Sequence, residues 1–483
     1  MPHALVGVFY DDGIYLALGK SLAEGHGYRH LYLPGAPRAV HYPPLYPVLL
    51  AALWKAWPAF PSNVAMLRAA NAALMGAFAA LATSYLARRF EVRPWLTALV
   101  VAASTTAIPV LAVATVLFSE PLFLALAAAA CLVGDAAREG GERRALGMAA
   151  AAGALAALAA LTRSIGVAVL AGVVVALLVA RRWKPALAAL GAGIVLLAPW
   201  AAWVTAYRHG IDPVIAANYG TYGDFLSQTG WSWLSLRGVL ELARPLGVIT
   251  LSILPFPVRV VVGLAAAAVL VGGLEVLVRR APAAGWMLLA YLVIVFLWPY
   301  GPDRFLWGVL PWLGAAFAAG AVSMAARRSG ALGRALRLAT ASVAVVVAGS
   351  YAASQARGFA TGAATSEQKG ISATMETALA WIRSSTDSSA VIAGEDEALI
   401  WLYTGRRAVP SYLWRVRGRS AESLGPDSLR AWLRRSRATH LLLTGPGSDA
   451  APTVDALLGR YPDDLHLVFA AGPVLGFRVA EAP

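Results

Sequence analysis

The chain has 483 residues, of which 59% are hydrophobic and only 14% are charged. A soluble domain is about one quarter charged, so this composition indicates an integral membrane protein and argues against a soluble enzyme. The formal net charge of +14 comes almost wholly from residues 1–353, which hold 26 of the 40 Lys and Arg but 13 of the 26 Asp and Glu. These cations lie on the connections between apolar runs, so they indicate membrane orientation and not a nucleic-acid-binding surface.

Cys131 is the only cysteine and lies inside an apolar run. The chain therefore forms no intramolecular disulfide, and no thiol-ligated metal site is suggested. We expect Cys131 to be a small packing residue.

The N-terminal stretch Met1–Tyr10 is apolar but too short to cross a bilayer, which takes about 20 residues. It has no features of a cleavable signal peptide, and we expect a first transmembrane helix to be truncated here. The next run, 12–25, has apolar residues at four-residue spacing and predicts a short amphipathic helix at the membrane surface. Pro43–Trp57 is apolar but short, which predicts a second interfacial helix.

Ten apolar runs are then predicted to span the membrane, giving about 10–11 transmembrane helices with the truncated one. These runs are 64–87, 94–113, 116–134, 145–161, 166–181, 184–206, 258–278, 284–300, 303–326 and 336–353. Five short connections between alternate runs hold 15 Lys and Arg, and the positive-inside bias places them in the cytoplasm. The alternation requires that Pro43–Trp57 and Val239–Pro257 do not cross. It places the first loop (10–63), the loop 207–240 and the C-terminal tail outside a plasma or inner membrane.

The tail, 354–483, has a different character and predicts a small outward-facing α/β domain after a transmembrane domain of residues 1–353. Helical patterns, at Glu376–Arg383, Ser428–Arg437 and Thr453–Leu458, alternate with short apolar strand patterns at Ala390–Ala393 and His440–Leu443. Leu465–Phe469 and Val474–Val479 are candidate closing strands. Neither a G-x-G-x-x-G motif after a strand nor a P-loop is present. The tail therefore lacks a nucleotide-phosphate motif, which suits an enzyme whose donor is a lipid.

Two adjacent carboxylates, Asp11 and Asp12, stand where the apolar N-terminus gives way to the first loop. Charges at a membrane face are costly and suggest function. Neighbouring residues at a helix start point about 100° apart, so one carboxylate can face a site while the other caps the helix. The alternative is that both are helix-start acids favoured by the helix dipole.

Three more charged residues stand at the outward ends of apolar runs. Glu120 lies just inside a helix that Ser119 and Pro121 begin, and it is either a helix-start acid or a functional group. Arg163 and Arg304 lie in outward turns. Each either extends harmlessly to the membrane surface or pairs with a phosphate.

Histidines and aromatic residues in the outward loops give weaker signals. His26, His30 and His41 share one loop but lack the spacing of a metal-binding motif, so surface histidines are the better interpretation. The loop 207–240 is rich in Tyr, Trp and Asn, which form either an interfacial belt or sugar-stacking groups.

Several short motifs, in order and on one predicted side, resemble the GT-C glycosyltransferases, specifically the protein mannosyltransferase-like and aminoarabinose transferase-like branch. Asp11-Asp12-Gly13-Ile14-Tyr15 is similar to Asp-Glu-x-x-Tyr of the family's first outward loop. The other matches are Tyr42-Pro43-Pro44-Leu45-Tyr46, Ser119-Glu120-Pro121, Leu161-Thr162-Arg163 and Trp401-Leu402-Tyr403-Thr404-Gly405-Arg406-Arg407. The chain departs from the family at two positions, with Asp12 in place of Glu and Tyr42 in place of the Lys of the aminoarabinose enzymes.

The resemblance implies inverting transfer of a sugar from a polyprenyl-phosphate donor to a lipid, glycan or protein acceptor on the outer face. It assigns the general base to Asp11 with Asp12 beside it, a second acid to Glu120, and phosphate or substrate contacts to Arg163, Arg304, Tyr15 and Tyr42. It leaves open whether Asp11 and Glu120 hold a divalent cation, and it implies no other cofactor and no nucleic acid.

Two other functions remain open from the sequence: a transporter or flippase, and a non-catalytic membrane scaffold. Transporters tend to have broken helices near the midplane and repeated halves. The polar residues here are predicted at one face and no repeat is visible, which favours the transferase.

Overall fold

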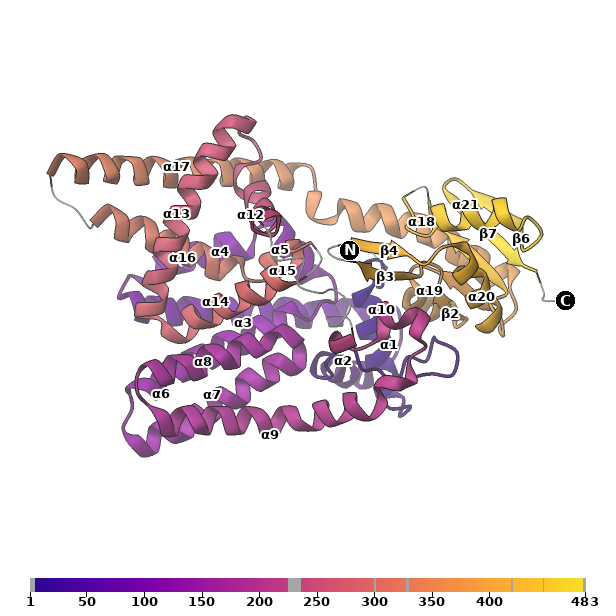
Figure 1. Cartoon of the computed structure of the whole chain (residues 1–483), viewed down its shortest axis with the longest axis horizontal. Coiled ribbons are helices and arrows are strands. Elements are labelled where there is room, and N and C mark those ends of the chain that lie inside the picture. The colour runs from indigo at the N-terminus through magenta and orange to yellow at the C-terminus, as the bar shows by residue number, and fades with distance from the viewer. Residues whose placement is uncertain are drawn as a thin grey trace.

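The structure is a computed structural model that describes residues 5–224, 236–298, 301–326, 330–417, 420–445 and 447–480. Apolar helices form one part of the molecule, and a small sheet with its helices forms the other (Figure 1). The N-terminal helices α1 (Asp11–Ala23) and α2 (Leu45–Ala56) lie between the two parts.

Among the described residues, six helices are long and apolar enough to cross a membrane, and a bent pair makes a seventh candidate. The six include α3 (Val64–Phe90), α6 (Glu120–Glu139), α7 (Glu142–Thr162), α9 (Trp183–Tyr207), α13 (Phe256–Arg280) and α17 (Gly330–Ala360). Three further predicted spans correspond to shorter apolar helices, α8 (Val167–Val179), α14 (Pro282–Leu297) and α16 (Leu310–Ala326). The chain is a multi-pass α-helical membrane protein, as predicted.

The apolar helices approach closely at small residues. A Cβ atom added at Gly153 of α7 would lie 2.0 Å from the carbonyl oxygen of Ala189 in α9, and one at Gly273 of α13 would lie 1.7 Å from that of Ala316 in α16. Both positions therefore require glycine. Such contacts are typical of membrane helices, which gain packing energy by bringing backbones together.

The predicted span 94–113 is not one helix. It consists of α4 (Pro94–Thr105) and α5 (Ile108–Thr115), bent by 72°. Pro109 at the start of α5 has no N–H to continue the helical ladder, and the hydroxyls of Thr105 and Thr106 bond back to their own helix. The predicted span 116–134 also starts later, at Glu120, because residues 116–118 form a link between α5 and α6.

The C-terminal part is an α/β unit, as predicted. Its five-stranded sheet has the order β2-β1-β5-β7-β6. β1 (Val391–Gly394) pairs in parallel with β2 (Arg407–Pro410) and β5 (His440–Leu443), whereas β7 (Val474–Val479) is antiparallel to β5 and to the edge strand β6 (Leu465–Ala471).

The helices of this unit are α18 (Ala363–Ser385), α19 (Glu397–Thr404), α20 (Pro426–Arg435) and α21 (Ala451–Arg460). A separate hairpin joins β3 (Trp414–Arg417) to β4 (Ser420–Ser423). Strands β2 to β4 and helix α19 were not expected from the sequence. They are only four to eight residues long, too short for a clear period.

Helix α1 forms where the amphipathic helix was predicted, but that helix was wrongly expected at the membrane surface. Most of its residues are buried, including Ile14, Tyr15 and Leu18, because α2 and α19 pack against it. The segment before it is held by Asp12, whose carboxylate accepts the N–H groups of Gly7 at 2.7 Å and Phe9 at 3.1 Å.

Candidate active site

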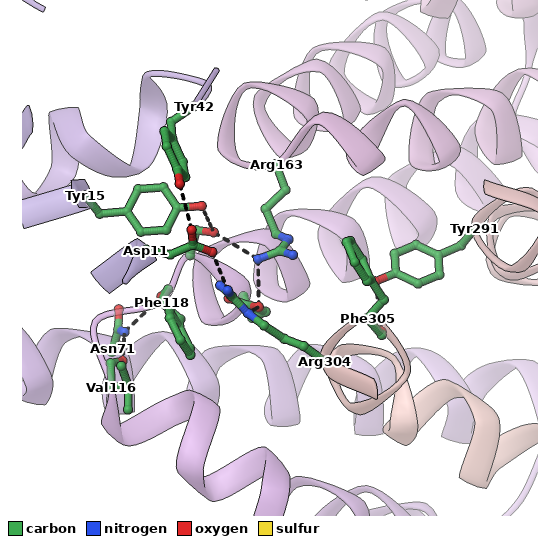
Figure 2. Close-up of polar contacts among 12 residues, drawn as sticks. Asp11, Tyr15, Tyr42, Asn71, Val116, Phe118, Arg163, Tyr291, Arg304 and Phe305 are labelled. Atoms are coloured by element: carbon green, nitrogen blue, oxygen red, sulfur yellow. Dashed lines mark hydrogen bonds and ion pairs between the residues drawn. The ribbon is translucent and has the colours of Figure 1, made fainter. Parts of the chain in front are cut away.

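Asp11, the first residue of α1, lies at the centre of an ionic cluster (Figure 2). One of its carboxylate oxygens accepts the hydroxyl of Tyr42 at 2.7 Å, and the other accepts Nη1 of Arg304. Its side chain is 26% exposed. Asp11 is therefore held in place by two groups while part of it remains accessible.

Glu120 is the anchor of the two arginines. It is the first residue of α6, and its side chain is 3% exposed. Arg304 donates two hydrogen bonds to the carboxylate of Glu120, at 2.6 and 3.3 Å, and Nη1 of Arg163 lies 2.7 Å from the same carboxylate. Because bidentate guanidinium–carboxylate pairs are directional, Glu120 fixes the orientation of Arg304.

The link between α5 and α6 brings Glu120 to this position. Asn71 of α3 donates hydrogen bonds to the carbonyl oxygens of Val116 and Phe118, both at 3.0 Å (Figure 2). It also accepts the hydroxyl of Tyr46 at 3.1 Å. Asn71 was not expected to matter. Its only sequence signal is an amide in an apolar run, where polar side chains usually bond to other segments.

Aromatic rings and a hydroxyl group also contact the two arginines. The guanidinium of Arg304, on the short helix α15 (Asp303–Gly308), lies 3.6 Å from the centre of the Phe118 ring. Arg163, the residue that ends α7, donates to the hydroxyl of Ser119 at 3.3 Å, and its guanidinium lies 5.6 Å from the Phe305 ring. Both cations therefore lie over rings, which favours cation–π contacts.

The electrostatics keep Asp11 ionised. Burial raises the pKa of Asp11, but the charge of Arg304 and the hydrogen bonds from Tyr42 and Arg304 lower it by more, so the pKa lies below its usual range. The cluster pairs two carboxylates with two guanidiniums. The four charges therefore cancel. A phosphate that enters the cluster can replace the carboxylate of Asp11 as a partner of Arg304.

Six of the residues singled out from the sequence meet here: Asp11, Tyr15, Tyr42, Glu120, Arg163 and Arg304. Tyr15 accepts the hydroxyl of Ser119 at 3.1 Å and packs edge-on to Tyr42, with ring centres 5.2 Å apart. Asp12 is not in the cluster. Its carboxylate faces the N-terminal segment.

The two acids of the cluster do not fit a divalent cation as they stand, because guanidinium groups occupy the carboxylates of Asp11 and Glu120. Within the ranges that the structure describes, no group of three or more His, Cys, Asp or Glu could hold a metal ion. The expectation that the loop histidines lie at the surface is wrong for His30, which is fully buried, whereas His26 is exposed. Nδ1 of His30 lies 2.8 Å from the hydroxyl of Tyr32, and Nδ1 of His41 lies 2.7 Å from the carbonyl oxygen of Gly220. Part of the aromatic loop, residues 225–235, lies outside the described residues.

No family model and no curated protein sequence matches the chain. Solved structures do. ArnT from Cupriavidus metallidurans bound to undecaprenyl phosphate aligns over 100% of this chain and 96% of its own, with a TM-score of 0.56 and 15% identity, and its apo state has a TM-score of 0.54. AglB, the oligosaccharyltransferase of Archaeoglobus fulgidus, in complex with an inhibitory peptide and a dolichol-phosphate, aligns over 91% of this chain and 66% of its own, with a TM-score of 0.51 and 11% identity.

The chain has the GT-C fold. Both neighbours are GT-C glycosyltransferases, and the fold predicted from the short motifs is thereby confirmed. At identities of 11 to 15% the likeness establishes the fold, and the activity has to be argued from the site.

Proposed function

We propose that this protein transfers a sugar from a polyprenyl-phosphate carrier to an acceptor hydroxyl, with inversion at the anomeric carbon. The observation that supports the proposal most is the arrangement at Asp11, where a partly exposed carboxylate stands beside two guanidiniums that a buried acid, Glu120, holds in place. Such a set offers a base for the acceptor and cations for a phosphate. The GT-C fold and the lipid phosphates bound by its structural neighbours agree with this choice.

In the proposed reaction Asp11 accepts the proton of the acceptor hydroxyl. The acceptor oxygen attacks the anomeric carbon from the face opposite the phosphate, and the bond from that carbon to the phosphate oxygen breaks. The electron pair leaves with the polyprenyl phosphate. Arg163 and Arg304 stabilise the charge on this leaving group, and no nucleotide is needed because the phosphate already leaves well.

Donor binding also prepares the base. In the free protein Arg304 lowers the pKa of Asp11, and a carboxylate with a low pKa is a weak base. A donor phosphate competes with Asp11 for the N–H groups of Arg304. When Arg304 turns to the phosphate, Asp11 loses its charge partner and becomes a stronger base at the moment when the sugar is in place.

The remaining residues have supporting roles in this proposal. Tyr42 orients Asp11 through its hydrogen bond, and Tyr15 supports both Tyr42 and Ser119. Asp12 serves the fold of the N-terminal segment and not the chemistry, since its carboxylate binds Gly7 and Phe9. The proposal includes no divalent cation.

The proposed location is the outer face of a plasma or inner membrane. Connections rich in Arg, such as Arg88–Arg93 and Arg279–Arg280, mark the cytoplasmic side by the positive-inside bias. The catalytic cluster, on the first loop and at the opposite helix ends, then faces outward together with residues 354–483. A cluster at one membrane face also favours a transferase over a transporter with a midplane site.

The test is consumption of a radiolabelled polyprenyl-phosphate sugar by the purified protein in lipid nanodiscs, with cell-envelope glycolipids and glycans as acceptors. We expect label to move from the lipid carrier to an acceptor, with the opposite anomeric configuration in the product. An intact donor in the presence of every acceptor class, or movement of the unaltered donor across the bilayer, would contradict the proposal.

A further inference from the structure

A group of buried polar atoms lies where the first loop, α10 (Ala216–Tyr219) and α19 meet. Nε2 of His30, the hydroxyl of Tyr219 and both carboxylate oxygens of Glu397 have no hydrogen-bond partner among the described residues. His30 and Tyr219 are 0% exposed and Glu397 is 1% exposed. Buried polar groups are normally paired, so several unpaired groups in one place require an explanation.

His30 and Tyr219 belong to an aromatic wall, which they form with Tyr32 and Trp401. The ring of Tyr219 lies 4.9 Å from the ring of His30 and 6.2 Å from the ring of Tyr32, and the ring of Tyr32 lies 6.3 Å from that of Trp401 in α19. Nδ1 of His30 and the hydroxyl of Tyr32 lie 2.8 Å apart. The wall therefore connects the first loop and α10 with the helix that begins at Glu397.

The same elements support the turn that carries Asp11. Asn218 of α10 donates a hydrogen bond to the hydroxyl of Tyr10 at 2.9 Å. Tyr10 directly precedes Asp11 and has a left-handed φ of 62°, a conformation that its surroundings must stabilise. On the other side, a Cβ atom at Gly7 would lie 2.6 Å from Cβ of Leu399, so the backbone before Asp11 rests directly on α19.

Glu397 is an acid without a counterion in the part of the chain that the structure describes. Burial raises its pKa well above the usual range, and the nearby charges of Asp396 and Glu395 act in the same direction, whereas the nearby hydroxyl of Tyr219 acts against them. The other titratable groups that act on it are Tyr10 and Tyr32. The raised pKa favours the protonated form of Glu397, which has one O–H donor and one carbonyl acceptor.

We propose that Glu397 is a positioning residue for Asp11: its carboxyl group joins Tyr219 and His30, through ordered water, in a buried network that holds the Tyr10–Asp11 turn against α19. Buried waters commonly make about three hydrogen bonds to such otherwise unpaired groups. The role rests on the proposed function, since it serves the proposed base. Loss of the Glu397 proton would place an unpaired charge beside Asp396 and Glu395, and the network would open.

Backbone hydrogen exchange over residues 7–19, corrected for intrinsic rates, tests this without substrate. We expect the wild-type protein to lose protection there between neutral and alkaline pH. Glu397→Gln, which stays neutral and has the same shape, keeps its protection at alkaline pH, and Tyr219→Phe has reduced protection at both. Asp427→Asn is the matched control, since its exposed carboxylate contacts only Arg460 and Tyr461 among the described residues, and it behaves as wild type.

Sugar transfer gives the second readout. The alkaline decline of turnover moves to higher pH in Glu397→Gln, and Tyr219→Phe loses about tenfold in turnover because a buried hydrogen-bonding group is left unpaired. Glu397→Gln with the wild-type pH dependence of exchange would overturn the proposal, as would an Asp427→Asn protein that behaves like Glu397→Gln. Hydrogen exchange tests the positioning role of Glu397 even where no sugar transfer is detected. Failure of this proposal can therefore be distinguished from failure of the proposed sugar transfer.

Discussion

Helix α6 has a buried carboxylate near each of its ends, Glu120 and Asp135, and the two ends are built differently. Asp135 is fully buried and accepts three groups: the hydroxyl of Tyr85 at 2.7 Å, the N–H of Ala283 at 3.1 Å and, as an ion pair, Nε of Arg89 at 3.3 Å. These partners come from α3 and from the start of α14, so Asp135 joins three helices. These contacts of Asp135 hold the packed helices together.

Glu120 is equally buried, but its partners are only partly so. Arg304 is 25% exposed and its second carboxylate partner, Asp11, is 26% exposed. A ligand at this end can therefore reach two guanidiniums and exchange with Asp11. At the other end a single guanidinium, that of Arg89, is 15% exposed, and it also pairs with the exposed Glu139. Two guanidiniums on one buried carboxylate, with a partly exposed second carboxylate beside them, and not the presence of an ion pair, distinguish the candidate catalytic cluster from the structural one.

Removal of Asp135 should have the largest effect on stability. Asp135→Ala leaves Arg89, Tyr85 and the start of α14 without their shared acceptor, and breaking a buried pair costs about 3 to 5 kcal/mol of unfolding free energy. Thermal unfolding in detergent measures the loss. Glu142→Ala, which removes an exposed carboxylate paired with Lys184, is the control and should unfold like wild type. Equal stability of the two variants would remove the contrast on which the comparison rests.

Removal of Arg163 should lower turnover without a comparable loss of stability. Arg163→Gln removes one cation from the proposed phosphate site, and loss of one such stabilising group costs about 100-fold in turnover. Steady-state kinetics with varied donor concentration would detect the loss. Arg279→Gln, at an exposed pair with Glu275, should transfer at the wild-type rate. Full activity of Arg163→Gln would mean that Arg163 only anchors a helix end.

The pH dependence should change with Arg304. Asp11 has a lowered pKa because the charge of Arg304 and its hydrogen bonds outweigh burial, so the ionised base persists as the pH falls below the usual carboxyl range. In Arg304→Gln the pKa of Asp11 rises, and the acid limb of kcat/KM moves to higher pH. An acid limb that stays in place, or moves to lower pH, would separate Asp11 from the catalytic step.

Much of the cluster could be predicted from the sequence because its charged members stand at the ends of apolar runs. Glu120, Arg163 and Arg304 stand out by their cost in a membrane, and the alternation of basic connections placed them on one side. Their pairing could not be predicted. Arg304 is distant in sequence from Asp11 and Glu120, and only the packed helices bring the three together.

The residues that were missed lack a local pattern. Asn71 and Asp135 act through partners on other helices, so their roles exist only in the tertiary structure. The break between α4 and α5 depends on Pro109, yet the hydrophobic pattern of the segment 94–113 is that of a single span. Helix α1 was placed at the membrane surface because α19, which covers it, was itself too short to predict.

The measurement that tests the account most directly is donor binding and single-turnover transfer by Asp11→Asn and Asp135→Asn, compared per folded molecule. Asp11→Asn keeps the shape of the side chain but cannot accept the acceptor proton, so we expect it to bind a radiolabelled polyprenyl-phosphate sugar and to transfer none of it. Asp135→Asn should be less stable and should transfer at the wild-type rate. Transfer by Asp11→Asn at the wild-type rate would contradict the assignment of the catalytic cluster. Loss of transfer in Asp135→Asn but not in Asp11→Asn would contradict it as well.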